Sequence, residues 1–138
     1  MNSKLIFRSF NNEDYTTVFK WWDWWWGEEK GIERSILPHD DYCYIIEKND
    51  IPVASAFLYV GKNAPIGYLT FIVSNPEYKE KDRRFIIEQL ITNIEEEAKS
   101  QGIKFVFTIC ESTHMQNIHN KLGWTISKAP SYETFKYI

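Results

Sequence analysis

The chain has 138 residues, with 16 Lys and Arg against 19 Asp and Glu and a formal net charge of -3. This length is typical of one domain, and we predict a single domain over residues 1–138. Net acidity without a basic block argues against a nucleic-acid-binding protein, because that affinity comes largely from Lys and Arg at phosphates. No apolar run approaches the roughly 20 residues of a membrane-spanning helix. We therefore expect neither a nucleic-acid nor a membrane partner.

The N-terminal residues and the cysteines indicate the compartment. The segment MNSKLIFRSFNNEDY turns polar after Phe10 and has no small-residue cleavage site, unlike a signal peptide. The 2 cysteines, Cys43 and Cys110, form no CxxC motif and suggest no disulfide framework. A reducing cytosol fits these features best, and we predict a cytoplasmic protein.

The first half of the chain alternates between the strand and helix periods of apolar residues. Acidic residues follow a pair of asparagines that can cap a helix, and turn-forming residues separate two apolar runs. The predicted elements are a strand over 4–10, a helix from Asn11-Asn12 to near Gly27, strands over 42–48 and 53–60 joined by an Asn49-Asp50 turn, and a central strand over 68–73.

The second half begins with a clear amphipathic helix, because its apolar residues recur at helical spacing until a glycine ends the pattern. The predicted elements are a helix from about Arg83 to Ser100, a buried strand over 103–110, a helix from Ser112 or Thr113 to Gly123, and a hairpin of strands 124–128 and 131–138.

The order of these elements is β-α-β-β-β-α-β-α-β-β. The strand, helix and strand over residues 68–110 form a βαβ unit, so its two strands should be parallel neighbours. We therefore predict an α/β fold with a mixed central sheet flanked by helices.

The junction before the second helix reads Tyr78-Lys79-Glu80-Lys81-Asp82-Arg83-Arg84. Ligands of open α/β sheets bind beyond the carboxyl ends of strands, where helix N-termini attract anions. Arginines in a first helical turn oppose the helix dipole, and an anionic partner would offset that cost. The alternative is a solvated charge run in which Glu80 and Asp82 neutralise the cations.

Five tryptophans between residues 21 and 26 cover most of the first helix's circumference, so they cannot all face the core. Trp22 and Trp25 continue the inward stripe from Val18, which leaves Trp21, Trp24 or Trp26 partly exposed. The exposed rings form either a wall of a binding site, a homodimer contact, or a surface covered by the loop over 28–38.

A metal or thiol site is not indicated. Cys110, Glu111, His114 and His119 are close in sequence, but two histidines five residues apart do not share a helix face. Cys110 ends a predicted buried strand, where a small cysteine usually serves packing. We predict no metal.

The element order over residues 4–138 resembles the GNAT superfamily of N-acetyltransferases. The segment from Phe71 to Lys79 is similar to the family's fourth strand and the turn into its acetyl-CoA loop, and His119-Asn-Lys-Leu-Gly-Trp124 is similar to its Tyr-x-x-x-Gly-Phe motif. Leu37-Pro38, the hairpin and Val73-Ser74-Asn75-Pro76 also resemble small GNAT-like proteins encoded by bacteriophages, which would place the chain in a host cytoplasm.

The resemblance implies acetyl-CoA as co-substrate and no metal. The family's loop runs Gln/Arg-x-x-Gly-x-Gly/Ala; Lys79 stands at its first position, whereas Asp82 and Arg84 replace the small residues that let backbone amides reach phosphate. Either Lys79, Lys81, Arg83 and Arg84 substitute charge-assisted side-chain bonds, or the site has lost acetyl-CoA.

The resemblance also implies roles for single residues. Ile72 and Val73 match the strand positions whose backbone polarises the thioester, and His119 stands where a tyrosine usually protonates the leaving thiolate. An imidazole can serve as that acid, although His119 also fits an exposed polar position. Ser112 matches a cofactor-contacting asparagine, and it has a sufficient structural reason as a helix N-cap.

In the family, the first helix borders the acceptor, so Trp22 and Trp25 are predicted acceptor contacts. No general base is assignable; Glu13, Asp23, Glu28 and Glu29 are candidates by neighbourhood only. We therefore expect an N-acetyltransferase that acts on an amine of a small molecule, peptide or protein. The alternative is a GNAT-shaped module without catalysis that binds partners or assembles through the Trp-rich helix.

Overall fold

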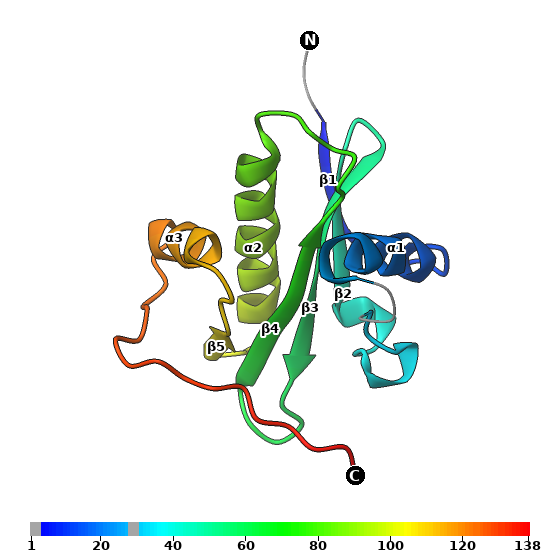
Figure 1. The fold of residues 1–138 in the computed structure, drawn as a ribbon. Coiled ribbons are helices and arrows are strands. Elements are labelled where there is room, and N and C mark those ends of the chain that lie inside the picture. The colour runs from blue at the N-terminus through cyan, green and yellow to red at the C-terminus, as the bar shows by residue number, and fades with distance from the viewer. Residues whose placement is uncertain (1–3, 28–30) are drawn as a thin grey trace.

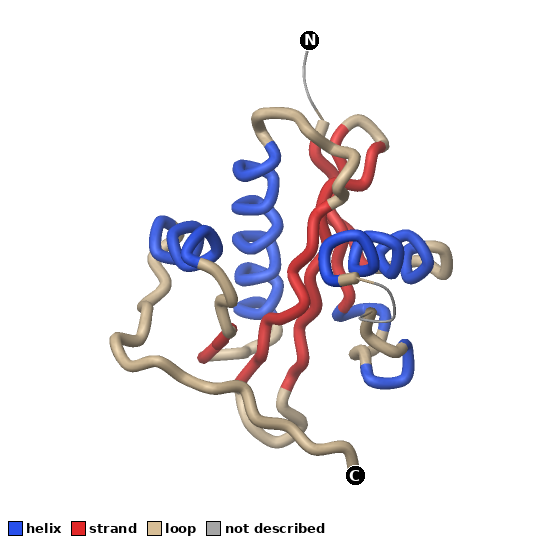
Figure 2. Tube along the Cα trace, viewed as in Figure 1, coloured by secondary structure: helices blue, strands red, loops and turns tan. Residues whose placement is uncertain are grey.

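The computed structural model describes residues 4–27 and 31–138 and contains one sheet with helices on both faces (Figures 1 and 2). Two of the base candidates named above, Glu28 and Glu29, lie outside the described residues. The elements are β1 (Leu5–Ser9), α1 (Asp14–Trp26), β2 (Cys43–Lys48), β3 (Ile51–Val60), β4 (Ile66–Ser74), α2 (Arg83–Ser100), β5 (Phe105–Thr108) and α3 (Thr113–Lys121), with short 3-10 helices at Arg34–Ile36 and Asp40–Tyr42.

The five strands lie in the order β1-β2-β3-β4-β5. The first four pair antiparallel, and β4 pairs with β5 in parallel, which confirms the predicted βαβ unit and the mixed sheet. Asn49 and Asp50 both have positive φ angles, of 50° and 68°, as the two-residue turn of a β-hairpin requires. The predicted turn is therefore confirmed.

The core has two layers because neighbouring residues of a strand point to opposite faces of the sheet. α1 covers one face, and α2 and α3 lie on the other (Figure 1). On β3, Phe57 packs under α1 with Trp22, whereas the adjacent Leu58 packs on the α2 side with Ile91. Among the described residues, no helix has the length and apolar character needed to cross a bilayer.

The predicted C-terminal hairpin is wrong. Residues 124–138 contain no strand, every side chain from 127 to 138 is exposed, and the tail passes the lower end of β4 (Figure 1). The segment Ser127-Lys128-Ala129-Pro130-Ser131 offers no apolar face, and Pro130 lacks the N–H that a sheet ladder needs.

The predicted buried strand over 103–110 is also only partly correct. β5 covers four residues, and Phe105 and Phe107 are 60% and 41% exposed. Its one neighbour in the described sheet is β4, so it lies at the edge. Since no hairpin pairs with its free side, β5 lacks the cover that burial requires.

The faces of α1 differ from the predicted ones. Val18, Trp21 and Trp22 are buried, whereas Trp24 and Trp25 are 64% and 43% exposed. The inward stripe therefore follows the i, i+3, i+4 spacing from Val18 and ends at Trp22. The Trp25 indole instead donates a hydrogen bond of 2.8 Å to the Ser74 carbonyl at the end of β4.

Candidate active site

The site begins where β4 and β5 stop pairing. The pairs between the two strands run from Ile66–Phe105 to Leu69–Thr108, and β4 continues without β5 to Ser74. On its other side, β4 has a bulge: β3 pairs through Phe57 with Thr70 and through Ser55 with Val73. Over the same stretch, β4 therefore has no pairing with β5 and an interrupted pairing with β3.

The bulge leaves two residues, Phe71 and Ile72, without partners in either ladder. Phe71 has a φ of 55°, a left-handed conformation that a bulky residue rarely adopts. Such strain persists where the surrounding fold enforces it, often at functional sites. Backbone polar groups of β4 are therefore outside the sheet ladders at this point.

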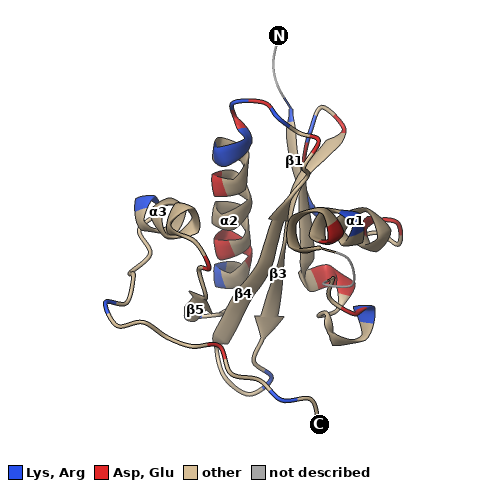
Figure 3. Ribbon diagram, in the orientation of Figure 1, with Lys and Arg blue, Asp and Glu red and all other residues tan. Residues whose placement is uncertain are grey.

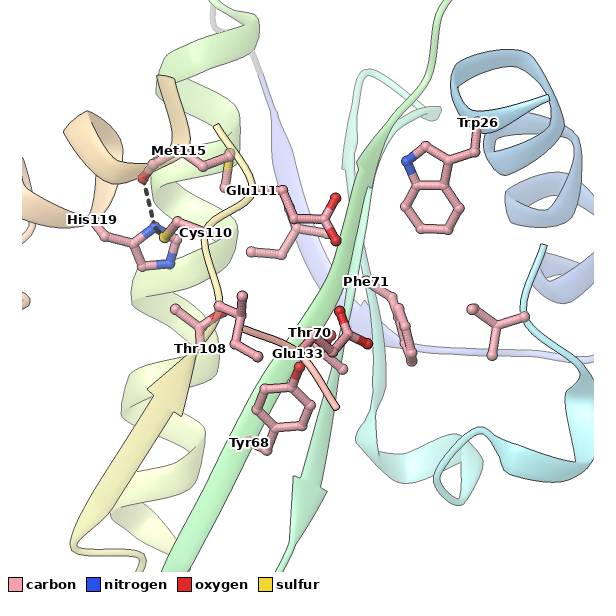
Figure 4. Close-up of a pocket in the computed structure, with 13 residues that line it drawn as sticks. Trp26, Tyr68, Thr70, Phe71, Thr108, Cys110, Glu111, Met115, His119 and Glu133 are labelled. Carbon is pink, nitrogen blue, oxygen red and sulfur yellow. Dashed lines mark hydrogen bonds between the residues drawn. The ribbon is translucent and has the colours of Figure 1, made fainter. Parts of the chain in front are cut away.

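A cavity of about 370 Å³ lies at this opening. His119 and Met115 lie on one side of β4, and Trp26 and Phe71 on the other (Figure 4). The cavity thus joins the α3 side to the α1 side through the gap between strands. Its lining consists of Trp26, Ile32, Tyr68, Thr70, Phe71, Ile72, Thr108, Ile109, Cys110, Glu111, Met115, His119 and Glu133.

His119 is 1% exposed, and its Nδ1 lies 2.8 Å from the Met115 carbonyl oxygen. A carbonyl oxygen only accepts hydrogen bonds, so Nδ1 carries the proton and Nε2 of the neutral ring is an acceptor. Nε2 is buried and has no hydrogen-bond partner. Burial lowers the pKa of His119 below its usual 6.5. At neutral pH Nε2 is therefore unprotonated, whereas a general acid must begin the reaction with a proton to give.

Replacing His119 by Asn is expected to reduce the acid sensitivity of folding. Because burial lowers the pKa of His119, the unfolded chain binds more protons than the folded one once the pH falls below 6.5. The stability contributed by neutral His119 is complete above that pH and is lost as the pH falls toward the folded-state pKa. Asn can still donate to the Met115 carbonyl but cannot titrate.

Urea unfolding at about pH 7.5 and about pH 5.5 measures this difference. The wild type should lose more stability between the two conditions than the His119→Asn variant. The matched control is His114→Asn, because His114 is exposed on the same helix. Equal losses in the wild type and His119→Asn would contradict the prediction.

The cysteines show no activated thiol. Burial raises the pKa of the Cys110 thiol, and Cys43, wholly buried in β2, has a pKa raised to about 12. Both therefore stay protonated near neutral pH, whereas nucleophilic cysteines need the thiolate. Across residues 4–27 and 31–138, no group of three or more His, Cys, Asp or Glu side chains is arranged to hold a metal ion.

Asp82, the N-cap residue of α2, is paired with side chains from other parts of the chain. Its carboxylate accepts hydrogen bonds from Lys48 on β2 and, at 2.6 Å, from the Tyr78 hydroxyl. These bonds, from Lys48 first, lower the pKa of Asp82. The cation of Lys48 thus compensates the negative charge of Asp82, which would otherwise repel a bound anion.

The cations of the loop gather at the N-terminus of α2 (Figure 3). The Arg83 guanidinium lies 5.9 Å from the centre of the Trp25 ring, a cation–π distance. Arg84 lies 3.7 Å from the buried carboxylate of Glu88, which Lys121 of α3 also contacts at 3.0 Å. Lys81 is exposed, and Lys79 lines a separate hollow beside the β2–β3 turn.

The other predicted residues divide between the cavity and the core. Ile72 lines the cavity, whereas Val73 is buried under α1. Trp22 is wholly buried, so its side chain has no surface for an acceptor. Ser112 caps α3, where its hydroxyl accepts a hydrogen bond of 3.2 Å from the Met115 N–H. Glu13 and Asp23 do not belong to the lining.

Among the lining residues, only Ile72 and His119 were predicted as site residues; Phe71, Glu111 and Glu133 are among those that were not. Glu111 had a usable signal, because it lies three residues beyond the end of β5, a strand parallel to β4. Glu133 had none, since it lies in a tail without regular structure.

Comparison with known proteins identifies the fold and the family. The sequence model of the family described as "Acetyltransferase (GNAT) family" matches residues 5–124. An amino-acid acetyltransferase of Ectopseudomonas mendocina is 30% identical over 91 residues, which are 62% of this chain and 20% of that protein. The chain therefore spans about a fifth of the length of this relative.

Two solved structures share the fold at low identity. AAC(6')-Iy, in complex with a bisubstrate analogue of CoA and acetylneamine, has a TM-score of 0.69 at 14% identity, covering 97% of this chain and 99% of its own. Diaminobutyrate acetyltransferase EctA from Paenibacillus lautus, with its substrate and coenzyme A, has a TM-score of 0.65 at 16% identity, covering 88% and 75%. These comparisons do not support the narrower resemblance to phage proteins, which stays a prediction.

Proposed function

This chain belongs to the GNAT family of acetyltransferases, and on that premise we propose that it transfers the acetyl group of acetyl-CoA to an amine. The observation that carries the proposal is the cavity at the gap between β4 and β5, beside backbone that no strand pairs. Direct transfer needs two reactants held together and a donor for the carbonyl oxygen. A gap open to both faces of the sheet supports the first requirement.

The residues present fit acetyl-CoA. When bound, it supplies an acetyl group activated as a thioester. The bulge at Phe71 and Ile72 supports the second requirement, because its backbone N–H groups are outside the ladders and adjoin the cavity. Val73 is the weaker of the two strand candidates, since it pairs with Ser55.

The N-terminus of α2 would hold the phosphates. First-turn N–H groups of a helix lack partners within the helix and favour an anion. Lys81, Arg83 and Arg84 add positive charge there, and Lys48 compensates Asp82. This arrangement supports the view that cationic side chains bind phosphate in place of the backbone amides that loop glycines would expose.

On the α3 side, His119 would orient the ligand rather than begin as an acid. Its Nε2 is an unpartnered acceptor in the cavity wall, so it can accept a hydrogen bond from a bound N–H or S–H group. Ser112, which caps the same helix and follows the lining residue Glu111, is kept as a proposed cofactor contact. The acceptor amine would enter beside Trp26 rather than Trp22.

Calorimetric titration with acetyl-CoA tests the proposal, followed by thiol release with a panel of amines. We expect a Kd in the micromolar range, about −8 kcal/mol, and acetyl transfer to at least one amine. The proposal would be rejected if about millimolar acetyl-CoA produced neither heat nor a thermal shift, since the binding free energy would then be no more favourable than about −4 kcal/mol.

The second candidate is a binding or assembly module without catalysis. The observation that favours it is the exposure of Trp24 and Trp25 on α1, since exposed aromatic rings mark contact surfaces. A homodimer through this helix belongs to the same hypothesis. Trp24→Ala should then abolish self-association or partner binding, and the titration with acetyl-CoA should show no binding.

A further inference from the structure

Resting on the proposed function, we propose that the acceptor is a polycationic amine without a carboxylate, bound by Glu111 and Glu133. Both residues line the cavity, Glu111 in the loop between β5 and α3 and Glu133 in the C-terminal tail. Figure 4 shows their carboxylates extending into the space between His119 and Phe71. Two segments far apart in sequence thus bring the same charge to one cavity.

The charge of the lining has one sign. Among the residues that the structure describes, the cavity has two carboxylates and no lysine or arginine. Within the described chain, neither Glu111 nor Glu133 has an ion-pair or hydrogen-bond partner. Both are therefore available to a cation.

His119 gives an independent reason for a donor-rich ligand. His119 lines the same cavity, and its Nε2 is a buried acceptor without a partner. A buried polar atom without a hydrogen bond is destabilising, and a bound N–H group would satisfy it. The carboxylates of Glu111 and Glu133 and the Nε2 of His119 are thus all hydrogen-bond acceptors. An ammonium-rich ligand can donate a hydrogen bond from every nitrogen.

Aromatic rings complete the acceptor side. Trp26, Tyr68 and Phe71 line the cavity, and the faces of such rings attract cations. An amino-acid acceptor would instead bring its own carboxylate toward Glu111 and Glu133 without a cation beside it in the described lining. Like charges brought together at an interface are strongly unfavourable. The cavity should therefore discriminate by the acceptor's carboxylate.

Three small amines differ from one another by single charged groups. 1,3-Diaminopropane has two ammonium groups, 2,4-diaminobutyrate adds a carboxylate to them, and propylamine has only one ammonium group. Thiol release at saturating acetyl-CoA should give 1,3-diaminopropane a kcat/KM about tenfold or more above the other two. Spermidine, with a third ammonium group, should be at least as good. A preference for 2,4-diaminobutyrate, or equal rates for the diamine and propylamine, would overturn the inference.

Glu111→Gln and Glu133→Gln keep the side-chain shape and remove the charge. Each should raise the KM for 1,3-diaminopropane about two- to fivefold and leave the KM for acetyl-CoA unchanged. Glu95→Gln, an exposed carboxylate of α2 outside the cavity, is the matched control and should change neither. An unchanged diamine KM in both cavity variants would overturn the inference.

A direct titration keeps the two proposals separable. Spermidine should bind the 138-residue chain without acetyl-CoA, more weakly as salt increases, and binding should weaken in both Gln variants. If spermidine binds but acetyl-CoA does not, the transferase function fails and the cation site stands. If acetyl-CoA binds and is turned over without a preference for the diamine, the cation site alone fails.

Discussion

Replacing Trp22 by alanine is expected to lower the free energy of unfolding by about 3–5 kcal/mol. Trp22 is wholly buried, and its ring lies 5.5 Å from Phe57 and 5.8 Å from Trp26, centre to centre. Truncation would leave a large void between α1 and the sheet, because a packed core relaxes only partly. Domains of this size are stable by only about 5–15 kcal/mol, so much of the total would be lost.

Urea unfolding followed by circular dichroism measures this effect, with the m-value checked for two-state behaviour. The matched control is Trp24→Ala, two residues along the same helix and 64% exposed, which should change stability by no more than about 0.5 kcal/mol. Similar losses in both variants would contradict the burial pattern of α1. Trp22 also contacts the bulge, with its ring 6.4 Å from that of Phe71, so Trp22→Ala should weaken acetyl-CoA binding as well.

The parts of the fold that depend on short-range patterns were predicted from the sequence. The apolar spacing and the glycine after it gave α2 its observed bounds, Arg83–Ser100. Asn49 and Asp50 gave the hairpin turn because both tolerate positive φ. The family resemblance then indicated the gap beside Ile72, which local patterns alone do not reveal.

The errors arose where a residue's environment comes from distant segments. The charge pattern of the loop left open whether its own acids neutralise its cations, and the structure supplies a third answer: Asp82 pairs with Lys48, 34 residues away. The protonation of His119 follows from its burial against Trp124 and its bond to the Met115 carbonyl, which spacing does not encode. β5 was expected to be buried because its apolar residues suggested partners that the tail does not provide.

Reversing both arginines at the start of α2, Arg83→Glu with Arg84→Glu, is expected to weaken acetyl-CoA binding about 100-fold or more. Charge-assisted hydrogen bonds contribute about 1.5–3 kcal/mol each, and about 1.4 kcal/mol corresponds to a factor of ten. Removing two such bonds therefore reaches this value before any repulsion is counted. Calorimetric titration of the wild type and the variant gives the ratio of Kd values.

The control is Lys99→Glu with Lys104→Glu, which changes the net charge equally at exposed positions in the last turn of α2 and just beyond it. It should change Kd by no more than about threefold, because charges beyond a Debye length of about 8 Å are screened. Since a glutamate at position 84 also faces buried Glu88, Arg83→Gln with Arg84→Gln provides a milder pair without like-charge repulsion. If that pair folds like the wild type and binds acetyl-CoA equally well, the arginines do not hold the phosphates, and the N–H groups of α2 must do so alone.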